Sequence, residues 1–156
     1  MEVGVKGKQA FENLNVLLVG NIPIELSRIF DNIRNVPGRK ILTEIAFDIK
    51  TIIERLAKFQ PNYILIDDNI GKLELKNAVK MLGKDKKTKN IPIAILKNSN
   101  YEEVFSVGVT DYILKENING QSLFTALSNS LKFRKTQLYL YKAMKRRKDQ
   151  LRKLAY

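Results

Sequence analysis

The sequence of 156 residues contains no cysteine and no histidine. Without cysteine the chain forms no disulfide, has no thiolate metal site and offers no cysteine nucleophile. Without histidine it has no imidazole general base, no imidazole metal ligand and no side chain for a phosphohistidine relay. These two absences exclude most familiar hydrolase mechanisms.

The sequence also lacks a long apolar run. No stretch approaches the roughly 18 apolar residues that a membrane span needs. The first 13 residues carry four charged side chains where a signal peptide would have an apolar segment. We therefore expect a cytosolic protein without a membrane span. Its length suits one domain with a sizeable core.

Positive charge is distributed unevenly along the chain, which has a formal net charge of +12. Residues 1–131 contain 18 Lys/Arg and 15 Asp/Glu, a net charge of +3. Residues 132–156 contain ten Lys/Arg and a single acid, Asp149, a net charge of +9. The body of the chain is nearly neutral, whereas its last 25 residues are strongly basic.

Residues 61–68, with the sequence PNYILIDD, run from a proline through apolar residues into two adjacent carboxylates. This pattern favours a strand buried on both faces, with Asp67 at its carboxyl end. Ligands gather at the carboxyl ends of strands in open parallel sheets, so Asp67 is a candidate functional residue. An aspartate there can equally cap the loop that follows. The residues of this stretch leave both interpretations open.

Strands and helices are expected to alternate along the rest of the chain. Apolar residues spaced by three and four predict helices with one buried face, and short apolar runs predict strands. Asn21 is expected to cap the first helix, Asp48 to cap the second and Gly83 to end the third. This order predicts an α/β fold with a doubly wound, five-stranded parallel sheet. The expected strands are residues 14–19, 40–46, 61–68, 91–96 and 111–114, and the expected helices are residues 22–35, 49–59, 73–82, 101–107 and 119 onward.

These elements resemble the receiver domain of two-component response regulators, the CheY-like (flavodoxin-like) fold, over residues 14–131. The resemblance puts Asp67 at the phosphoacceptor position. It also matches residues 108–115 (GVTDYILK) to the fifth-strand signature, with Lys115 as the lysine that contacts the phosphoryl group and Tyr112 as the aromatic switch residue. It implies a signalling module rather than an enzyme, with a histidine kinase or a downstream effector as its partner.

The sequence departs from the receiver pattern where the pattern supplies Mg²⁺ and phosphoryl contacts. The acid pair that follows the first strand is replaced by Gly20 and Asn21, and neither is an anionic ligand for a hard cation. The Thr or Ser after the fourth strand is replaced by Lys97. Asp67, Asp68 and Asn21 remain as weak metal candidates.

Two interpretations of this pocket follow from the resemblance. In the first, the domain is an atypical receiver that needs no cofactor, Lys97 and Lys115 neutralise Asp67, and Tyr112 is a static packing residue. In the second, the domain is a conventional regulator phosphorylated on Asp67 with Mg²⁺. Lys97 pointing simply into solvent is equally compatible with the sequence.

The resemblance implies that the last helix ends near Leu131, yet strong helix formers continue to Tyr156. We expect three segments: an amino-terminal extension (1–13), the receiver-like domain (14–131) and a helical extension (132–156). The extension contains a short, imperfect heptad seam of apolar character. A projecting helix is marginal in water, so we expect it to pack on a partner or on its own body, with homodimerisation as the first choice. The seam positions are Phe133, Gln137, Leu140, Met144, Arg147, Leu151 and Leu154.

The basic residues of the extension, clustered at residues 145–148 with Arg152 and Lys153, permit another interpretation. Such a cluster is compatible with binding to nucleic acid or to anionic lipid. A solvated helix face is the commoner explanation, and no aromatic stacking platform accompanies the cluster.

Overall fold

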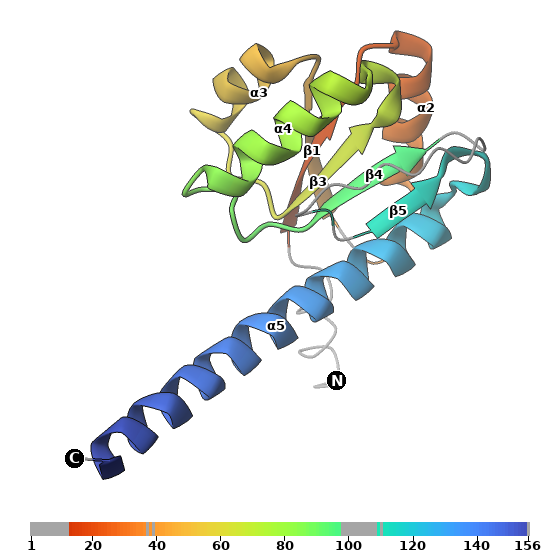
Figure 1. Ribbon diagram of the computed structural model, residues 1–156. Helices are drawn as coiled ribbons and strands as arrows, with labels where there is room; N and C mark the ends of the chain where they lie inside the picture. The colour runs from red at the N-terminus through yellow and green to blue at the C-terminus, as the bar shows by residue number, and fades with distance from the viewer. Residues whose placement is uncertain (1–12, 37, 39, 98–108, 110, 156) are drawn as a thin grey trace.

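The computed structural model describes residues 13–36, 38, 40–97, 109 and 111–155. Within these ranges, five strands pair in parallel to form one sheet in the order β2-β1-β3-β4-β5 (Figure 1). The sheet confirms the predicted doubly wound α/β architecture. The strands are β1 (Asn13–Val19), β2 (Lys40–Ala46), β3 (Tyr63–Asp67), β4 (Ile93–Lys97) and β5 (Asp111–Leu114).

Helices cover both faces of the sheet, because alternate residues of the central strands point to opposite sides. On one face, α2 (Pro23–Arg34) and the first turns of α5 (Gly120–Ala155) pack on residues such as Val16 and Leu65. On the other face, α3 (Ile49–Leu56) and α4 (Lys72–Lys84) pack on residues such as Leu17 and Ile66. The central strand β3 is buried along its whole length, as its apolar run predicts.

Several helix boundaries differ from the sequence-based expectation. The N-cap of α2 is Ile22, which makes no side-chain cap bond, so Asn21 is not the cap. Gly83 does not end α4, because the helix continues to Lys84 and the Asp85 N–H donates to the Met81 carbonyl. Helix α3 ends three residues early, at Leu56. The predicted cap Asp48 is confirmed, since it accepts a hydrogen bond from the Thr51 N–H at 2.8 Å.

Two further differences concern the fourth and fifth strand units. Strand β4 begins at Ile93, two residues later than expected, and includes Lys97. The helix expected over residues 101–107 lies outside the described residues. Two short 3₁₀ turns follow the strands at the same edge of the sheet, η1 (Asp68–Ile70) after β3 and η2 (Lys115–Asn117) after β5.

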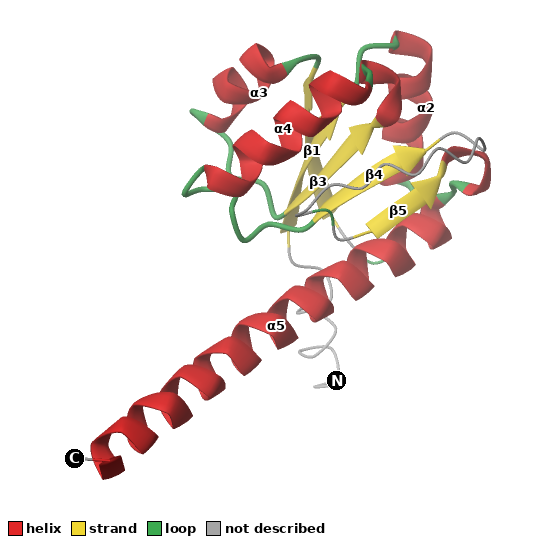
Figure 2. Cartoon of the chain, in the orientation of Figure 1, coloured by secondary structure: helices red, strands yellow, loops and turns green. Residues whose placement is uncertain are grey.

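The last helix, α5, is a single helix of 36 residues, about 54 Å long at 1.5 Å per residue. Its first turns are docked on the body by the buried residues Leu123 and Leu127. Beyond Leu131 it projects away from the sheet (Figures 1 and 2). The predicted extended carboxyl-terminal helix is therefore confirmed. Among the described segments, no helix is both long enough and apolar enough to cross a membrane.

Candidate functional site

Asp67 is the last residue of β3, and its side chain is 1% exposed. Strand β3 lies between β1 and β4, so Asp67 sits at the carboxyl edge near the middle of the sheet. Its Oδ1 accepts a hydrogen bond from the Asn69 N–H at 2.9 Å, which caps η1. Asp67 thus caps the following turn and also occupies the place where ligands gather in parallel sheets.

The ammonium of Lys115 is surrounded by carboxylates from three elements. Lys115 begins η2 directly after β5, and its side chain is 3% exposed. Its Nζ lies 2.6 Å from Asp67 Oδ1, 3.5 Å from Asp68 Oδ1 and 3.7 Å from Glu25 Oε1. A buried ammonium needs such partners, because an uncompensated charge in the interior is very costly. We name the group Asp67, Asp68, Glu25 and Lys115 the lysine cage.

Helix α2 closes the lysine cage from the side. Glu25 lies in the first turn of α2, and Arg28 one turn later places its Nη2 3.4 Å from Glu25 Oε1. The Arg28 Nη1 also donates a hydrogen bond to the Lys115 carbonyl at 3.3 Å. Glu25 and Arg28 therefore hold α2 against both the side chain and the backbone of Lys115.

Glu25 and Arg28 were not predicted as site residues from the sequence. In the sequence they form an acid–base pair spaced by three on a helix, which is common on exposed helix surfaces. The only signal that distinguishes them is their place in the first turns after β1, at the edge of the sheet where Asp67 lies.

Gly20 lies beside the lysine cage, where a side chain would crowd Leu26 and Asp67. A Cβ atom at Gly20 would lie 2.7 Å from Leu26 Cδ2 and 3.3 Å from Asp67 Cβ. A carboxylate at this position would require Leu26, which is buried, to move. The glycine therefore allows α2 to pack closely against the end of β3.

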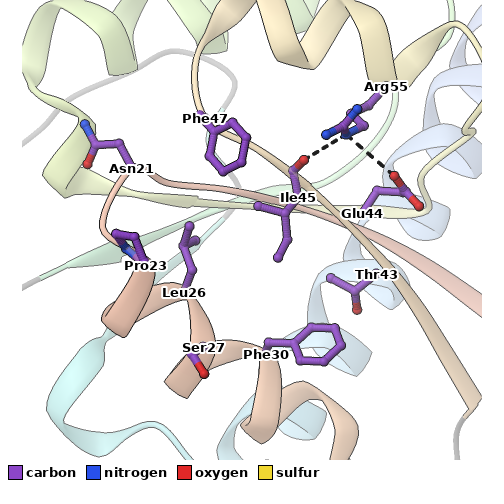
Figure 3. A pocket seen from close by; sticks show the side chains of 10 residues that line it. All are labelled: Asn21, Pro23, Leu26, Ser27, Phe30, Thr43, Glu44, Ile45, Phe47 and Arg55. Carbon is purple, nitrogen blue, oxygen red and sulfur yellow. Dashed lines mark hydrogen bonds and ion pairs between the residues drawn. The ribbon is translucent and has the colours of Figure 1, made fainter.

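Asn21 lies at the rim of a groove of about 500 Å³ between α2 and the edge strand β2 (Figure 3). Apolar side chains of α2 and β2, such as Phe30 and Ile45, line most of this groove, and Phe47 follows β2 beside them. At one end of it, the Arg55 Nε donates to the Ile45 carbonyl at 2.9 Å and lies 3.6 Å from Glu44 Oε1. Through that bond, Arg55 covers part of the open edge of β2.

Lys97 is the last residue of β4, and Tyr112 is the second residue of the neighbouring strand β5. The Lys97 Nζ is 5.7 Å from the centroid of the Tyr112 ring, within the range of a cation–π contact. Tyr112 is 42% exposed, and its role as a static packing residue stays a prediction. Pairing of Lys97 with Asp67 stays a prediction.

The lysine cage fits Mg²⁺ poorly. Its three carboxylates lie around the Lys115 ammonium, with oxygens 2.6, 3.5 and 3.7 Å from Nζ, so the ammonium lies where a shared cation would be bound. Gly20 has no ligand atom in its side chain, and Asn21 offers only a neutral amide. Within the described ranges, no group of three or more acidic, His or Cys side chains has the geometry of a metal site.

The sequence matches no family model and no curated protein, whereas solved structures match well. The receiver domain of a sensor histidine kinase from Pseudomonas aeruginosa, crystallised with magnesium in its active-site cleft, matches with a TM-score of 0.66 and 16% identity over 78% of this chain and 99% of that one. The chain has the CheY-like fold of receiver domains. The chemotaxis response regulator CheY4 of Vibrio cholerae shares this receiver fold, with a TM-score of 0.59 and 19% identity over 76% of this chain and 99% of that one.

A third match extends beyond the receiver fold. It is a segment of the yeast Spc42 trimeric coiled coil fused to another protein, with a TM-score of 0.62 and 21% identity over 90% of this chain and 93% of that one. Ninety per cent of the 156 residues is about 140, more than the 131 residues that end at Leu131. The likeness therefore extends into the projecting part of α5.

Proposed function

We propose that this chain is an atypical receiver, a non-catalytic module of two-component-type signalling that acts by protein–protein interaction. Residues 14–131 form its receiver-like domain and residues 132–156 its output helix. The observation that carries the proposal is the segment after β1, where Gly20 and Asn21 provide no acidic metal ligand beside the Asp67–Lys115 pair. A histidine kinase or a downstream effector is the class of partner that the receiver fold suggests.

The proposal follows from what phosphoryl transfer to an aspartate requires. A carboxylate attacks a negatively charged phosphorus only where a bound cation and positioned donors offset the charge. In this chain Gly20, which follows β1, offers no carboxylate, and a side chain there would crowd Leu26. The carboxylate of Glu25 is engaged by Lys115 and Arg28. The lysine cage therefore favours one fixed electrostatic state over a cycle of phosphorylation.

A conventional receiver is the alternative, because Asp67 and Lys115 are both present and in contact. Incubation of the protein with Mg²⁺ and acetyl phosphate, followed by intact-mass measurement, separates the two. We expect no phosphorylated species. A stoichiometric mass increase that disappears in Asp67→Asn would overturn the proposal. Beryllofluoride with Mg²⁺ gives an independent test. If it binds, the backbone NMR signals of the residues around Asp67 shift or broaden.

The projecting part of α5 is the proposed output surface. Its apolar seam residues are exposed, from 52% for Leu140 to 83% for Leu154. A solitary helix of this kind is marginal in water, which supports a role in assembly. Homodimerisation, which the heptad spacing predicts, makes a second copy of the chain the alternative occupant of the seam. Light scattering of the full chain beside a Leu140→Lys variant tests homodimerisation directly.

A further inference from the structure

The seam of α5 is not purely apolar, because Arg147 occupies one of its seven positions. Residues 133, 137, 140, 144, 147, 151 and 154 recur at spacings of four and three and share one face of the helix. Arg147 is therefore placed between the layers of Met144 and Leu151. Both of these neighbours are largely exposed, at 71% and 60%. A protein that covers the seam must also cover the Arg147 guanidinium.

A second copy of this chain has no acid to offer Arg147. The only acid in residues 132–156 is Asp149. Asp149 lies two residues from Arg147, which is about 200° around the helix, so it points to the opposite face. This holds for parallel and for antiparallel pairing of two copies. A homodimer seam would cover Arg147 without a carboxylate, and covering an unpaired charge is costly.

The charge of the whole projecting segment also disfavours a homodimer through the seam. Residues 132–156 carry ten basic side chains and one acid, so two copies side by side would bring two segments of net charge +9 together. Such a field repels a like segment and attracts an acidic one. Several of these basic residues lie on the helix beside the seam positions, and Lys145, Lys148 and Arg152 are all exposed.

We propose that the projecting part of α5 docks an acidic amphipathic helix of a different protein. The partner helix lays its apolar stripe on Leu140, Met144 and Leu151, a carboxylate within that stripe pairs with Arg147, and further acids face the flanking lysines. This inference rests on the proposed function, which makes α5 the output, and it names the chemistry of the partner. An arginine held among apolar contacts is a typical centre of binding energy in an interface.

The test uses the full chain and three labelled synthetic helical peptides, with binding measured by fluorescence anisotropy. The first peptide has a leucine seam, one central seam glutamate and glutamates on both flanks. The second has the same leucine seam with lysine flanks and a seam lysine. The third keeps the glutamates but has serine in place of leucine. We expect only the first peptide to bind; binding of the second, or equal binding of the third, would overturn the proposal.

A matched pair of variants separates a specific seam contact from general attraction. Arg147→Glu and Arg146→Glu make the same change of charge at adjacent residues, but residue 146 lies about 100° away, off the seam. We expect Arg147→Glu to weaken binding of the first peptide at least about tenfold. We expect Arg146→Glu to weaken it no more than about twofold, as for an exposed charge pair. Equal losses in the two variants would contradict a seam contact.

Self-association and other anionic partners are outcomes of the same experiment. A dimer of the full chain by light scattering at micromolar concentration would overturn the proposal, because the seam would already be covered. Binding to duplex DNA or to vesicles containing phosphatidylserine as tight as binding to the first peptide would overturn it as well. None of these results depends on Asp67. The mass measurement with acetyl phosphate therefore tests the atypical receiver separately.

Discussion

The Nζ of Lys115 lies 2.6 Å from Asp67 Oδ1, and the two side chains are 3% and 1% exposed. The residues come from the ends of two strands that do not neighbour each other, because β4 lies between β3 and β5. Asp68 and Glu25 add negative charge around the same ammonium. Loss of Lys115 would therefore leave three carboxylates without their shared cation.

Replacement of Lys115 by Met is expected to destabilise the protein strongly. Removing one partner of a buried ion pair typically costs about 3–5 kcal/mol, since the other charge stays buried without compensation. Urea unfolding of the two proteins measures the difference. In the double variant Lys115→Met/Asp67→Asn, part of the loss should be recovered, because the buried negative charge is removed as well. Additive losses would mean that the pair makes no net electrostatic contribution.

The contact of Glu25 with Lys115 predicts a smaller effect. Glu25 is 30% exposed, so solvent screens its charge more than that of Asp67. We expect Glu25→Gln to lower the free energy of unfolding by about 1 kcal/mol. Asp31→Asn is the matched control, because Asp31 also pairs with an arginine of α2, but both side chains are more than 60% exposed. Equal effects of the two variants would exclude a role for Glu25 in the lysine cage.

The sequence allowed the fold and the position of Asp67 to be predicted because both follow from local patterns. A fully apolar run marks β3 as a central strand, and Asp67 ends it. The lysine cage was only partly predictable. The Arg28–Lys115 hydrogen bond joins residues 87 positions apart, and nothing in the spacing of Glu25 and Arg28 indicates which surface α2 presents to η2.

Helix ends were harder to predict than the helices themselves, and Gly83 shows why. A glycine after an apolar stripe usually ends a helix, but here the hydrogen bond from Asp85 to Met81 extends α4 beyond it. The deciding contacts lie after the glycine, where the Thr88 Oγ donates to the Leu82 carbonyl at 2.7 Å. The local pattern alone does not contain this information.

Gly83 and Gly120 are expected to respond in opposite ways to replacement by alanine. A Cβ at Gly120 would lie 2.5 Å from the Asn35 carbonyl oxygen, where the start of α5 meets the end of α2. A Cβ at Gly83 meets nothing within 4 Å, inside a regular helix. Gly120→Ala should lower stability by about 1–3 kcal/mol through overpacking. Gly83→Ala should raise it by about 0.5–1 kcal/mol. Thermal unfolding of both variants checks the contrast, and stabilisation by Gly120→Ala would contradict the close approach of α5 to α2.

Tyr63 predicts a loss of stability in alkaline solution. Burial beneath α5 raises the pKa of the Tyr63 phenol to about 12, while its hydroxyl lies 3.5 Å from Ser130 Oγ. The unfolded chain has the ordinary pKa of about 10, so the protonated phenol favours the folded state. This contribution is fully present below about pH 10 and is lost between about pH 10 and 12, at about 1.4 kcal/mol per pH unit.

Other tyrosines and lysines titrate in the same range, so the relevant quantity is the difference between the native protein and Tyr63→Phe. Urea unfolding of both proteins from pH 8 to 11.5 should give a constant difference up to about pH 10 and then a decline of the native protein relative to the variant. Parallel curves over the whole range would mean that the phenol ionises as easily in the folded protein as in the unfolded chain.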